Sequence, residues 1–136
     1  MKRLFIDSDI LLDVLLDRPP HFDPAAALLN AGFSKSIQLY TSGLVVSHMI
    51  YFLKDVHKYN QVKGLLNSLL NGINICTIDH SVIEAALFSN WKELEDAIQY
   101  FAAIQAKVDA IITRNKKDYK LSRIPVYTAA EWGSLT

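Results

Sequence analysis

A chain of 136 residues can bury one hydrophobic core but has little room for a second, so we expect one domain over residues 1–136. Hydrophobic residues make up 51% of the chain and charged residues 21%, which excludes a disordered protein. The 14 basic and 14 acidic side chains cancel, which counts against broad non-specific binding to DNA. This balance still allows a small site that contacts phosphate through metal ions.

The sequence has a single cysteine and lacks the long apolar runs of membrane proteins. Cys76 is the only cysteine, so it has no partner for an intramolecular disulfide, and we expect it to be a small core residue. No apolar run approaches the roughly 18 residues of a membrane-spanning helix. Only a short apolar segment separates Met1-Lys2-Arg3 from Asp7, which argues against a secretory signal. We therefore expect a cytoplasmic protein with no membrane association.

Short apolar runs alternate with helical patterns in the first half of the chain. Leu4-Phe5-Ile6 is typical of a strand that is buried on both faces of a parallel sheet. Proline and glycine delimit the helices that follow this strand. In chain order we expect a helix over Asp9–Leu16 that stops at Arg18-Pro19-Pro20, a helix capped by Asp23 with Pro24 at its first position and Gly32 near its end, a strand over Ile37–Thr41, and a helix that begins at Ser42 or Ser47.

The same alternation continues in the second half of the chain. Asn71-Gly72 is a stop signal for a helix, and the segment Trp91–Ala106 is rich in residues of high helix propensity. In chain order we expect a helix over Asn60–Leu70, a strand over Ile73–Ile78, a helix capped by Asp79 or Ser81, a helix over Trp91–Ala106, a strand over Ala110–Thr113, a short strand at Val126-Tyr127 and a terminal helix.

Short strands that alternate with helices predict an α/β fold. We expect a three-layer α/β/α arrangement around a central parallel sheet of four to five strands. Ligands bind to such sheets beyond the carboxyl ends of the strands. The residues that directly follow each strand are therefore the candidates for a functional site.

Acidic side chains follow two of the predicted strands. Asp7 and Asp9 come after the first strand, and Asp118 follows the fourth. Aspartate at a helix N-terminus also serves as a cap, so Asp7 fits capping and function equally well, while Asp9 fits capping better. Asp13 lies one turn beyond Asp9, and we expect it to be solvated or paired with Arg18.

A third acidic group, Glu93, Glu95 and Asp96, lies in the predicted helix over Trp91–Ala106. Glu95 and Asp96 flank the expected apolar stripe on opposite sides, so periodicity does not decide which of them turns toward a site. On this ground alone we expect both to face solvent. The expected stripe consists of Leu94, Ala97, Ile98, Phe101, Ile104 and Val108.

Several carboxylates at one edge of a sheet point to a hard cation. Oxygen-rich sites select Mg²⁺ or Mn²⁺, whereas zinc prefers nitrogen and sulfur ligands. Two such ions about 3.5–4 Å apart can activate a water and stabilise the leaving oxygen in phosphodiester cleavage. Without a cation the clustered carboxylates would repel one another. The pattern therefore favours metal-dependent hydrolysis of a phosphodiester.

Four segments of the chain together resemble the PIN domain family. They are Leu4–Asp13, Arg18-Pro19-Pro20, Glu95–Ala103 and Ile111–Tyr119, the last with tyrosine where the family motif has phenylalanine. They span nearly the whole chain in the order and spacing of the family. The resemblance implies a ribonuclease that depends on Mg²⁺ or Mn²⁺, similar to the VapC-like toxins of toxin–antitoxin pairs. It also implies an RNA substrate, an antitoxin protein as partner and a homodimer.

Carried over residue by residue, the resemblance assigns metal binding and catalysis to Asp7, Asp96 and Asp118. The alignment, not periodicity, selects Asp96 over Glu95. The resemblance also implies contacts to the substrate or to the metal ligands for a further group of side chains. These are Ser8, Asp9, Thr113 and Asn115.

One position departs from the family pattern. His48 stands in the segment where many relatives have a glutamate. A histidine there could coordinate Mn²⁺ or, when protonated, bind phosphate. Equally, the change could mean weaker metal binding or lost activity.

Basic and aromatic side chains near these motifs have two interpretations each. Arg114, Lys116 and Lys117 could contact RNA phosphates or belong to a solvated loop. Three tyrosines could stack on bases, although we expect helical aromatic residues to be part of the core. These are Tyr51, Tyr100 and Tyr119.

Two hypotheses of other classes remain open. The first is a catalytically impaired PIN-like module that binds RNA or protein, which His48 favours. The second is a phosphoryl-transfer enzyme with Asp7 as nucleophile, because Asp7-Ser8-Asp9 after a strand is similar to the motif of the haloacid dehalogenase superfamily. Leu11 stands where that superfamily usually has threonine or valine, and its later Asp-Asp pair is missing.

Overall fold

A five-stranded parallel sheet forms the centre of the computed structural model, which describes residues 1–136. The strand order is β3-β2-β1-β4-β5, and every neighbouring pair is parallel. The strands are β1 (Arg3–Ile6), β2 (Gln38–Ser42), β3 (Ile73–Cys76), β4 (Ala110–Ile112) and β5 (Val126–Tyr127). The predicted α/β class and the number of strands are confirmed.

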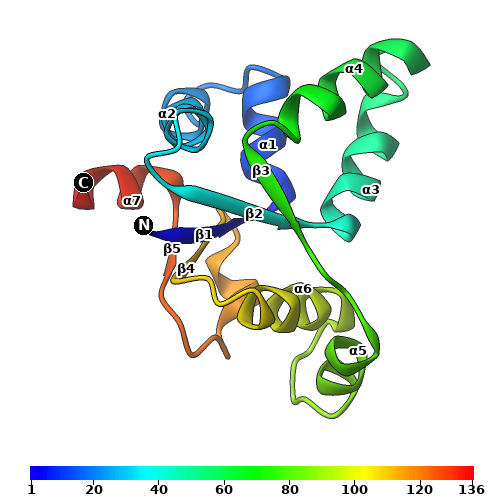
Figure 1. The fold of residues 1–136 in the computed structure, drawn as a ribbon, viewed down its shortest axis with the longest axis vertical. Coiled ribbons are helices and arrows are strands. Elements are labelled where there is room, and N and C mark those ends of the chain that lie inside the picture. The colour runs from blue at the N-terminus through cyan, green and yellow to red at the C-terminus, as the bar shows by residue number, and fades with distance from the viewer.

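Helices lie on both sides of the sheet. In Figure 1, α1 to α4 lie above the sheet, whereas α5 and α6 lie below it, which confirms the predicted three layers. The helices are α1 (Ser8–Leu15), α2 (Phe22–Phe33), α3 (Gly43–Leu53), α4 (Tyr59–Leu69), α5 (His80–Leu87), α6 (Leu94–Gln105) and α7 (Ala129–Leu135), with a 3₁₀ turn η1 at Lys116–Tyr119. No helix is both long enough and apolar enough to cross a membrane.

The two central strands form the middle of the hydrophobic core. Phe5 and Ile6 of β1 and Ile111 and Ile112 of β4 are completely buried. Helices cover both faces of these strands, so β1 from Leu4 onward and the whole of β4 are buried and apolar. Each such side chain contributes roughly 1.5–3 kcal/mol when it leaves water. This rigid pair of strands carries the residues of the candidate site.

Side-chain caps begin the helices that follow the strands. Asp7 caps α1 and accepts a hydrogen bond from the Ser8 backbone N–H at 2.8 Å. Ser42 caps α3 and Asp79 caps α5, which decides between the alternatives left open by the sequence. Cys76 is buried at the end of β3, where burial raises the pKa of its thiol to about 12.

Two predicted helix starts are wrong. Helix α2 begins at Phe22, so Asp23 and Pro24 lie inside its first turn, where a missing N–H costs nothing because the first four have no helical acceptor. Helix α6 begins at Leu94 and not at Trp91. The Trp91 ring packs against Tyr100, with 4.6 Å between centroids, and Glu93, the residue before the helix, has extended backbone.

The buried face of α6 also differs from the predicted stripe. Leu94 is 52% and Ile104 is 37% exposed, although both were expected in the core. The buried side chains are instead mostly small or polar: Ala97, Gln99, Tyr100, Ala102 and Ala103. Ala97 and Val108 of the predicted stripe are buried, and Ile98 and Phe101 are partly buried against the core. The prediction missed the burial of Gln99, Tyr100, Ala102 and Ala103. Gln99 is satisfied there because its side-chain oxygen accepts a hydrogen bond from the Ser42 hydroxyl at 3.0 Å.

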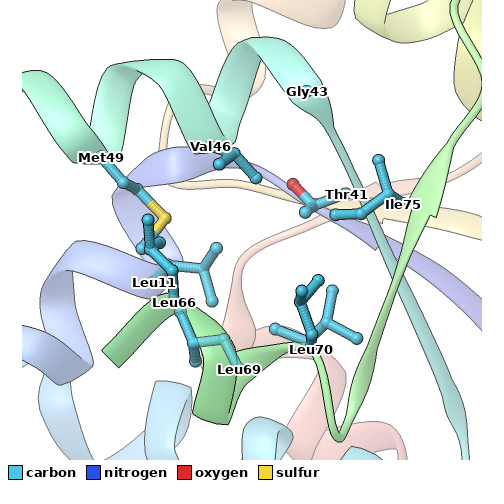
Figure 2. A pocket seen from close by; sticks show the side chains of 10 residues that line it. Leu11, Thr41, Gly43, Val46, Met49, Leu66, Leu69, Leu70 and Ile75 are labelled. Carbon is cyan, nitrogen blue, oxygen red and sulfur yellow. The ribbon is translucent and has the colours of Figure 1, made fainter. Parts of the chain in front are cut away.

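An apolar hollow of about 270 Å³ lies between α3, α4 and the sheet (Figure 2). Met49 from α3 and Leu66 from α4 point into it, and Ile75 of β3 closes one side. The adjacent exposed part of α3 carries Ile50, Tyr51 and Phe52, which are 43%, 65% and 53% exposed. The surface of α3 therefore exposes three large apolar side chains next to this hollow.

Candidate active site

The candidate site lies where the carboxyl ends of β1 and β4 meet. After β1 the chain builds β2 and β3 on one side of it and then returns to build β4 on the other side. Such a switch point leaves a crevice beyond the strand ends. The Asp7 backbone N–H donates to the Ile112 carbonyl at 3.1 Å, so the two strands stay paired to their last residues. Asp7 and Thr113 consequently lie side by side.

Asp7 is held by three donors. One carboxylate oxygen accepts from the Ser8 backbone N–H at 2.8 Å. The other accepts from the Thr113 hydroxyl at 3.2 Å and from the Tyr119 hydroxyl at 3.3 Å. Burial raises the pKa of Asp7, these hydrogen bonds lower it in part, and the charge of Asp118 raises it further. The result is a desolvated carboxylate in a fixed orientation.

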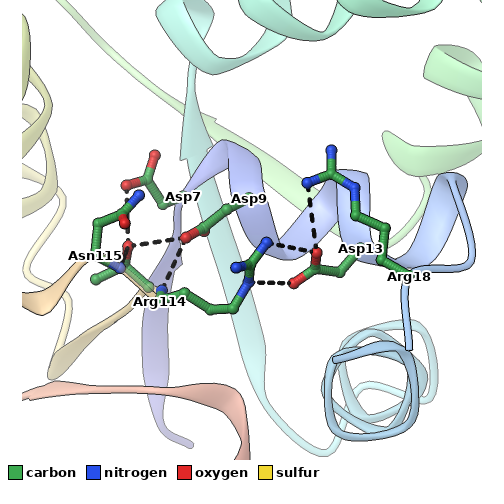
Figure 3. Close-up of polar contacts among 7 residues, drawn as sticks. Asp7, Asp9, Asp13, Arg18, Arg114 and Asn115 are labelled. Atoms are coloured by element: carbon green, nitrogen blue, oxygen red, sulfur yellow. Dashed lines mark hydrogen bonds and ion pairs between the residues drawn. The ribbon is translucent and has the colours of Figure 1, made fainter. Parts of the chain in front are cut away.

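Asp9 is fixed by the segment that follows β4 (Figure 3). One of its oxygens accepts from the Arg114 backbone N–H at 2.8 Å and lies 3.4 Å from the Thr113 hydroxyl. Thr113 has one hydroxyl proton, so it can donate to Asp7 or to Asp9 but not to both at once. The other oxygen of Asp9 is buried and has no hydrogen-bond partner. Burial, followed by the charge of Asp7, raises the pKa of Asp9.

Asp13 is buried, which contradicts the expectation that it is solvated. Its carboxylate is 1% exposed and accepts two hydrogen bonds from the Arg114 guanidinium, at 2.8 and 2.9 Å (Figure 3). The expected partner Arg18 is also present, with 3.8 Å between the charged atoms. Arg114 is therefore engaged in a two-pronged ion pair that ties α1 to the loop after β4. The pairing with Arg114 was missed, although the i, i+4 spacing of Asp9 and Asp13 already placed both on one face of α1.

Asp96 and Asp118 reach the same region from other elements. Asp96 lies in the first turn of α6, one turn before the buried Gln99 and Tyr100, and therefore on the helix face that packs inward. Its pKa is raised to about 6 by burial and by the charges of Asp118 and Asp7. Asp118 lies on η1 and is exposed. The charge of Asp118 thus acts on both Asp7 and Asp96, which places the three carboxylates in one region.

The acidic side chains of this region have the chemistry of ligands for a divalent cation. All of the donors are carboxylate oxygens, which suit a hard cation such as Mg²⁺ or Mn²⁺. The raised pKa values of Asp7 and Asp96 and the unpartnered oxygen of Asp9 indicate negative charge that no basic side chain neutralises. No three His, Cys, Asp or Glu side chains are arranged closely enough to hold an ion as they stand. The carboxylate donors suit Mg²⁺ or Mn²⁺, and binding of such an ion requires these side chains to move closer together.

The remaining candidates occupy different places. His48 faces Glu95, with 2.6 Å between its Nε2 and the carboxylate, and both side chains are about half exposed. Asn115 contributes its backbone N–H to the Thr113 hydroxyl at 3.1 Å, whereas its side chain is exposed. Tyr100 and Tyr119 are buried, as expected for core residues. The role of the Tyr119 hydroxyl as a donor to Asp7 was not foreseen.

The fold and this acidic crevice define an α/β protein with an oxygen-rich site at the switch point of a parallel sheet. The sequence profile of the PIN domain family matches residues 3–117. The chain therefore belongs to the PIN domain family, and the haloacid dehalogenase hypothesis is set aside.

Individual relatives resemble the chain along nearly its whole length. Ribonuclease VapC1 of Aquifex aeolicus (strain VF5) is 21% identical over 136 residues, which cover 96% of this chain and 93% of that protein. A chain in a toxin-antitoxin complex from Klebsiella pneumoniae is 27% identical, with a TM-score of 0.69 and coverage of 93% of this chain and 97% of that one. VapBC2 from Rickettsia felis, bound to a DNA fragment from its promoter, shares the fold at 15% identity, with a TM-score of 0.68 and coverage of 91% and 96%.

The Asp13–Arg114 ion pair predicts a stability difference between two neighbouring cations. Arg114→Ala should lower the free energy of unfolding by about 3 kcal/mol, because it leaves the buried Asp13 carboxylate without its main partner. Lys116→Ala is the matched control, since it breaks an exposed pair with Glu131 and should change stability little. Urea denaturation of the two variants measures the difference. Equal losses would show that the Asp13 pair has no special structural role.

The raised pKa of Asp96 predicts a pH-dependent effect of Asp96→Asn. The folded protein holds the Asp96 proton up to about pH 6, whereas the ordinary value is 3.8. Folded protein therefore binds more protons than unfolded chain between these values, and stability from this group falls as pH rises through the window. Asp96→Asn should stabilise the metal-free protein at pH 7.5, and the gain should shrink toward pH 4.

Urea denaturation in a metal chelator at both pH values measures this effect. Asp55→Asn, on the exposed turn after α3, is the control and should change stability little at either pH. A gain from Asp96→Asn that is the same at both pH values would contradict the assignment.

Proposed function

We propose that this chain is a Mg²⁺- or Mn²⁺-dependent endoribonuclease and the toxin of a toxin–antitoxin pair. Residues 1–136 would act as one PIN-like domain in the cytoplasm. The feature that carries the proposal is the grouping of Asp7, Asp96 and Asp118 at the switch point of the sheet, where the charge of Asp118 raises the pKa of the other two. A protein with no use for this charge would be more stable without it. A bound cation would neutralise these carboxylates and so account for their grouping.

Asp7, Asp96 and Asp118 would hold the metal, with Asp9 beside them. When bound, a divalent cation supplies Lewis acidity and positive charge to a phosphodiester. The chain's own contribution is to orient the ligands. Thr113 and Tyr119 hold one oxygen of Asp7, and the Ser8 backbone N–H holds the other. These contacts resist rotation of the carboxylate when substrate and metal bind.

The proposed partners follow from the relatives and from the surface. The resemblance to chains from toxin-antitoxin and VapBC structures supports an antitoxin protein as partner. The exposed apolar side chains of α3, Ile50, Tyr51 and Phe52, are the kind of surface that protein contacts cover. A homodimer remains part of the proposal on the family resemblance.

A second candidate function is a catalytically impaired module that binds RNA or protein. His48 favours it, because its imidazole contacts Glu95 and does not add a carboxylate to the acidic group. In an active enzyme the same contact would have a positioning role, because His48 would hold the start of α6 and with it Asp96. The two functions differ in whether RNA is cleaved.

The proposal predicts that the protein cleaves RNA only with a divalent metal ion and that cleavage requires Asp7. Purified protein with Mn²⁺ or Mg²⁺ should degrade single-stranded RNA, and a chelator should stop it. Asp7→Asn should lower the rate by more than about 100-fold, since even partners outside a metal's ligand set cost about 10–100-fold. Gel analysis of labelled RNA measures the rates.

Asp55→Asn is the control for this assay because it removes an exposed carboxylate outside the site, and it should cleave as the unaltered protein does. Cleavage that survives Asp7→Asn would show that the activity comes from another site or a contaminant. Tight RNA binding without cleavage would favour the impaired module.

A further inference from the structure

A hollow lined by lysines opens beside the acidic site. It has a volume of about 420 Å³, and Asp118 forms part of its wall. Three of its lining residues are Lys92, from the segment before α6, and Lys117 and Lys120, from η1 and its end. We call it the lysine pocket; its other lining residues are Asn90, Trp91 and Leu121.

The three ammonium groups of the lysine pocket have no anionic partner within the chain. None of them forms an ion pair, a hydrogen bond or a contact with an aromatic ring. Other cations near the site are engaged: Arg114 pairs with Asp13 and Lys116 with Glu131. Of the basic residues singled out in the sequence, this leaves Lys117 available for an external anion, joined by two lysines that the sequence did not single out.

Ordered elements position these lysines. Side chains three residues apart in a 3₁₀ turn lie on the same side, so Lys117 and Lys120 project together. The Trp91 ring packs against Tyr100 and against Tyr119, with centroid distances of 4.6 and 5.8 Å, and this anchors the segment that carries Lys92. The pocket therefore combines three lysines on ordered backbone with the apolar side chains of Trp91 and Leu121.

The charges of the lysine pocket select an anion. The lining of the pocket contains three lysines and one carboxylate, that of Asp118, so the lining itself carries net positive charge although the chain as a whole is neutral. The volume lies within the range of about 300–1,000 Å³ that is usual for small-ligand sites, which suits one or two nucleotides better than a duplex. Single-stranded nucleic acid is commonly bound by a positive groove with aromatic residues in its wall.

We propose that the lysine pocket binds the phosphate backbone of single-stranded RNA next to the cleaved bond. The inference rests on the proposed ribonuclease function and assigns the neighbouring part of the substrate to Lys92, Lys117 and Lys120. Asp118 belongs both to the pocket wall and to the acidic group, since its charge raises the pKa of Asp7 and of Asp96. RNA held by the lysines therefore runs directly past the carboxylates.

Salt dependence of RNA binding tests this inference. The protein used is the full chain with Asp7→Asn, which keeps labelled single-stranded RNA intact at constant Mg²⁺. Each phosphate neutralised on a single strand contributes about 0.7 to the slope of log binding constant against log salt. Adding Lys92→Ala, Lys117→Ala and Lys120→Ala should lower the slope by about 2. Fluorescence anisotropy at increasing KCl measures it.

A second triple variant controls for net charge. Lys2→Ala, Lys54→Ala and Lys63→Ala remove the same charge from places outside the pocket and should leave the slope within experimental error. A slope that falls equally in both triple variants, or in neither, overturns the lysine pocket while cleavage by the unaltered chain keeps the ribonuclease proposal standing. A chain that neither binds nor cleaves RNA overturns both.

Discussion

Electrostatic repulsion among Asp7, Asp96 and Asp118 is the constraint around which the site is built. The parallel sheet brings the first of these to the buried end of β1, and α6 and η1 bring the others. Burial of Asp96, followed by the charges of Asp118 and Asp7, raises the pKa of Asp96 to about 6. Folding therefore accumulates negative charge that nothing else in the chain neutralises.

The surrounding contacts orient the carboxylates but do not neutralise their negative charge. Thr113 and Tyr119 donate to Asp7 but carry no positive charge. The one guanidinium nearby, Arg114, is directed away to Asp13, and only its backbone N–H reaches Asp9. Basic side chains free of partners lie further out, in the lysine pocket. In our proposal the acidic group therefore binds a small cation, and the lysine pocket beside it binds the phosphate backbone of RNA.

Much of the fold could be predicted because its signals are local. Buried parallel strands have uninterrupted apolar sequence, and caps such as Ser42 and Asp79 mark the helices that follow them. Asp7 and Asp118 could be placed at the same edge of the sheet from that alternation alone. The inward face of α6 could be predicted only in part: Ala97 lies in the expected stripe, whereas Gln99 is buried through a hydrogen bond with Ser42 that no hydrophobic pattern signals. The partner of Arg114 and the grouping of Lys92 with Lys117 depend on tertiary contacts between distant segments.

Calorimetric titration of the purified chain with Mn²⁺ at pH 7.5 tests the central claim, that the acidic crevice is a cation site, without relying on activity. The account predicts saturable binding at millimolar or lower Mn²⁺, which Asp118→Asn weakens strongly and Asp55→Asn leaves unchanged. Asp118 is exposed, so its replacement should not disturb the core. Absence of Mn²⁺ binding by the unaltered chain, or equal binding by all three proteins, would contradict the account.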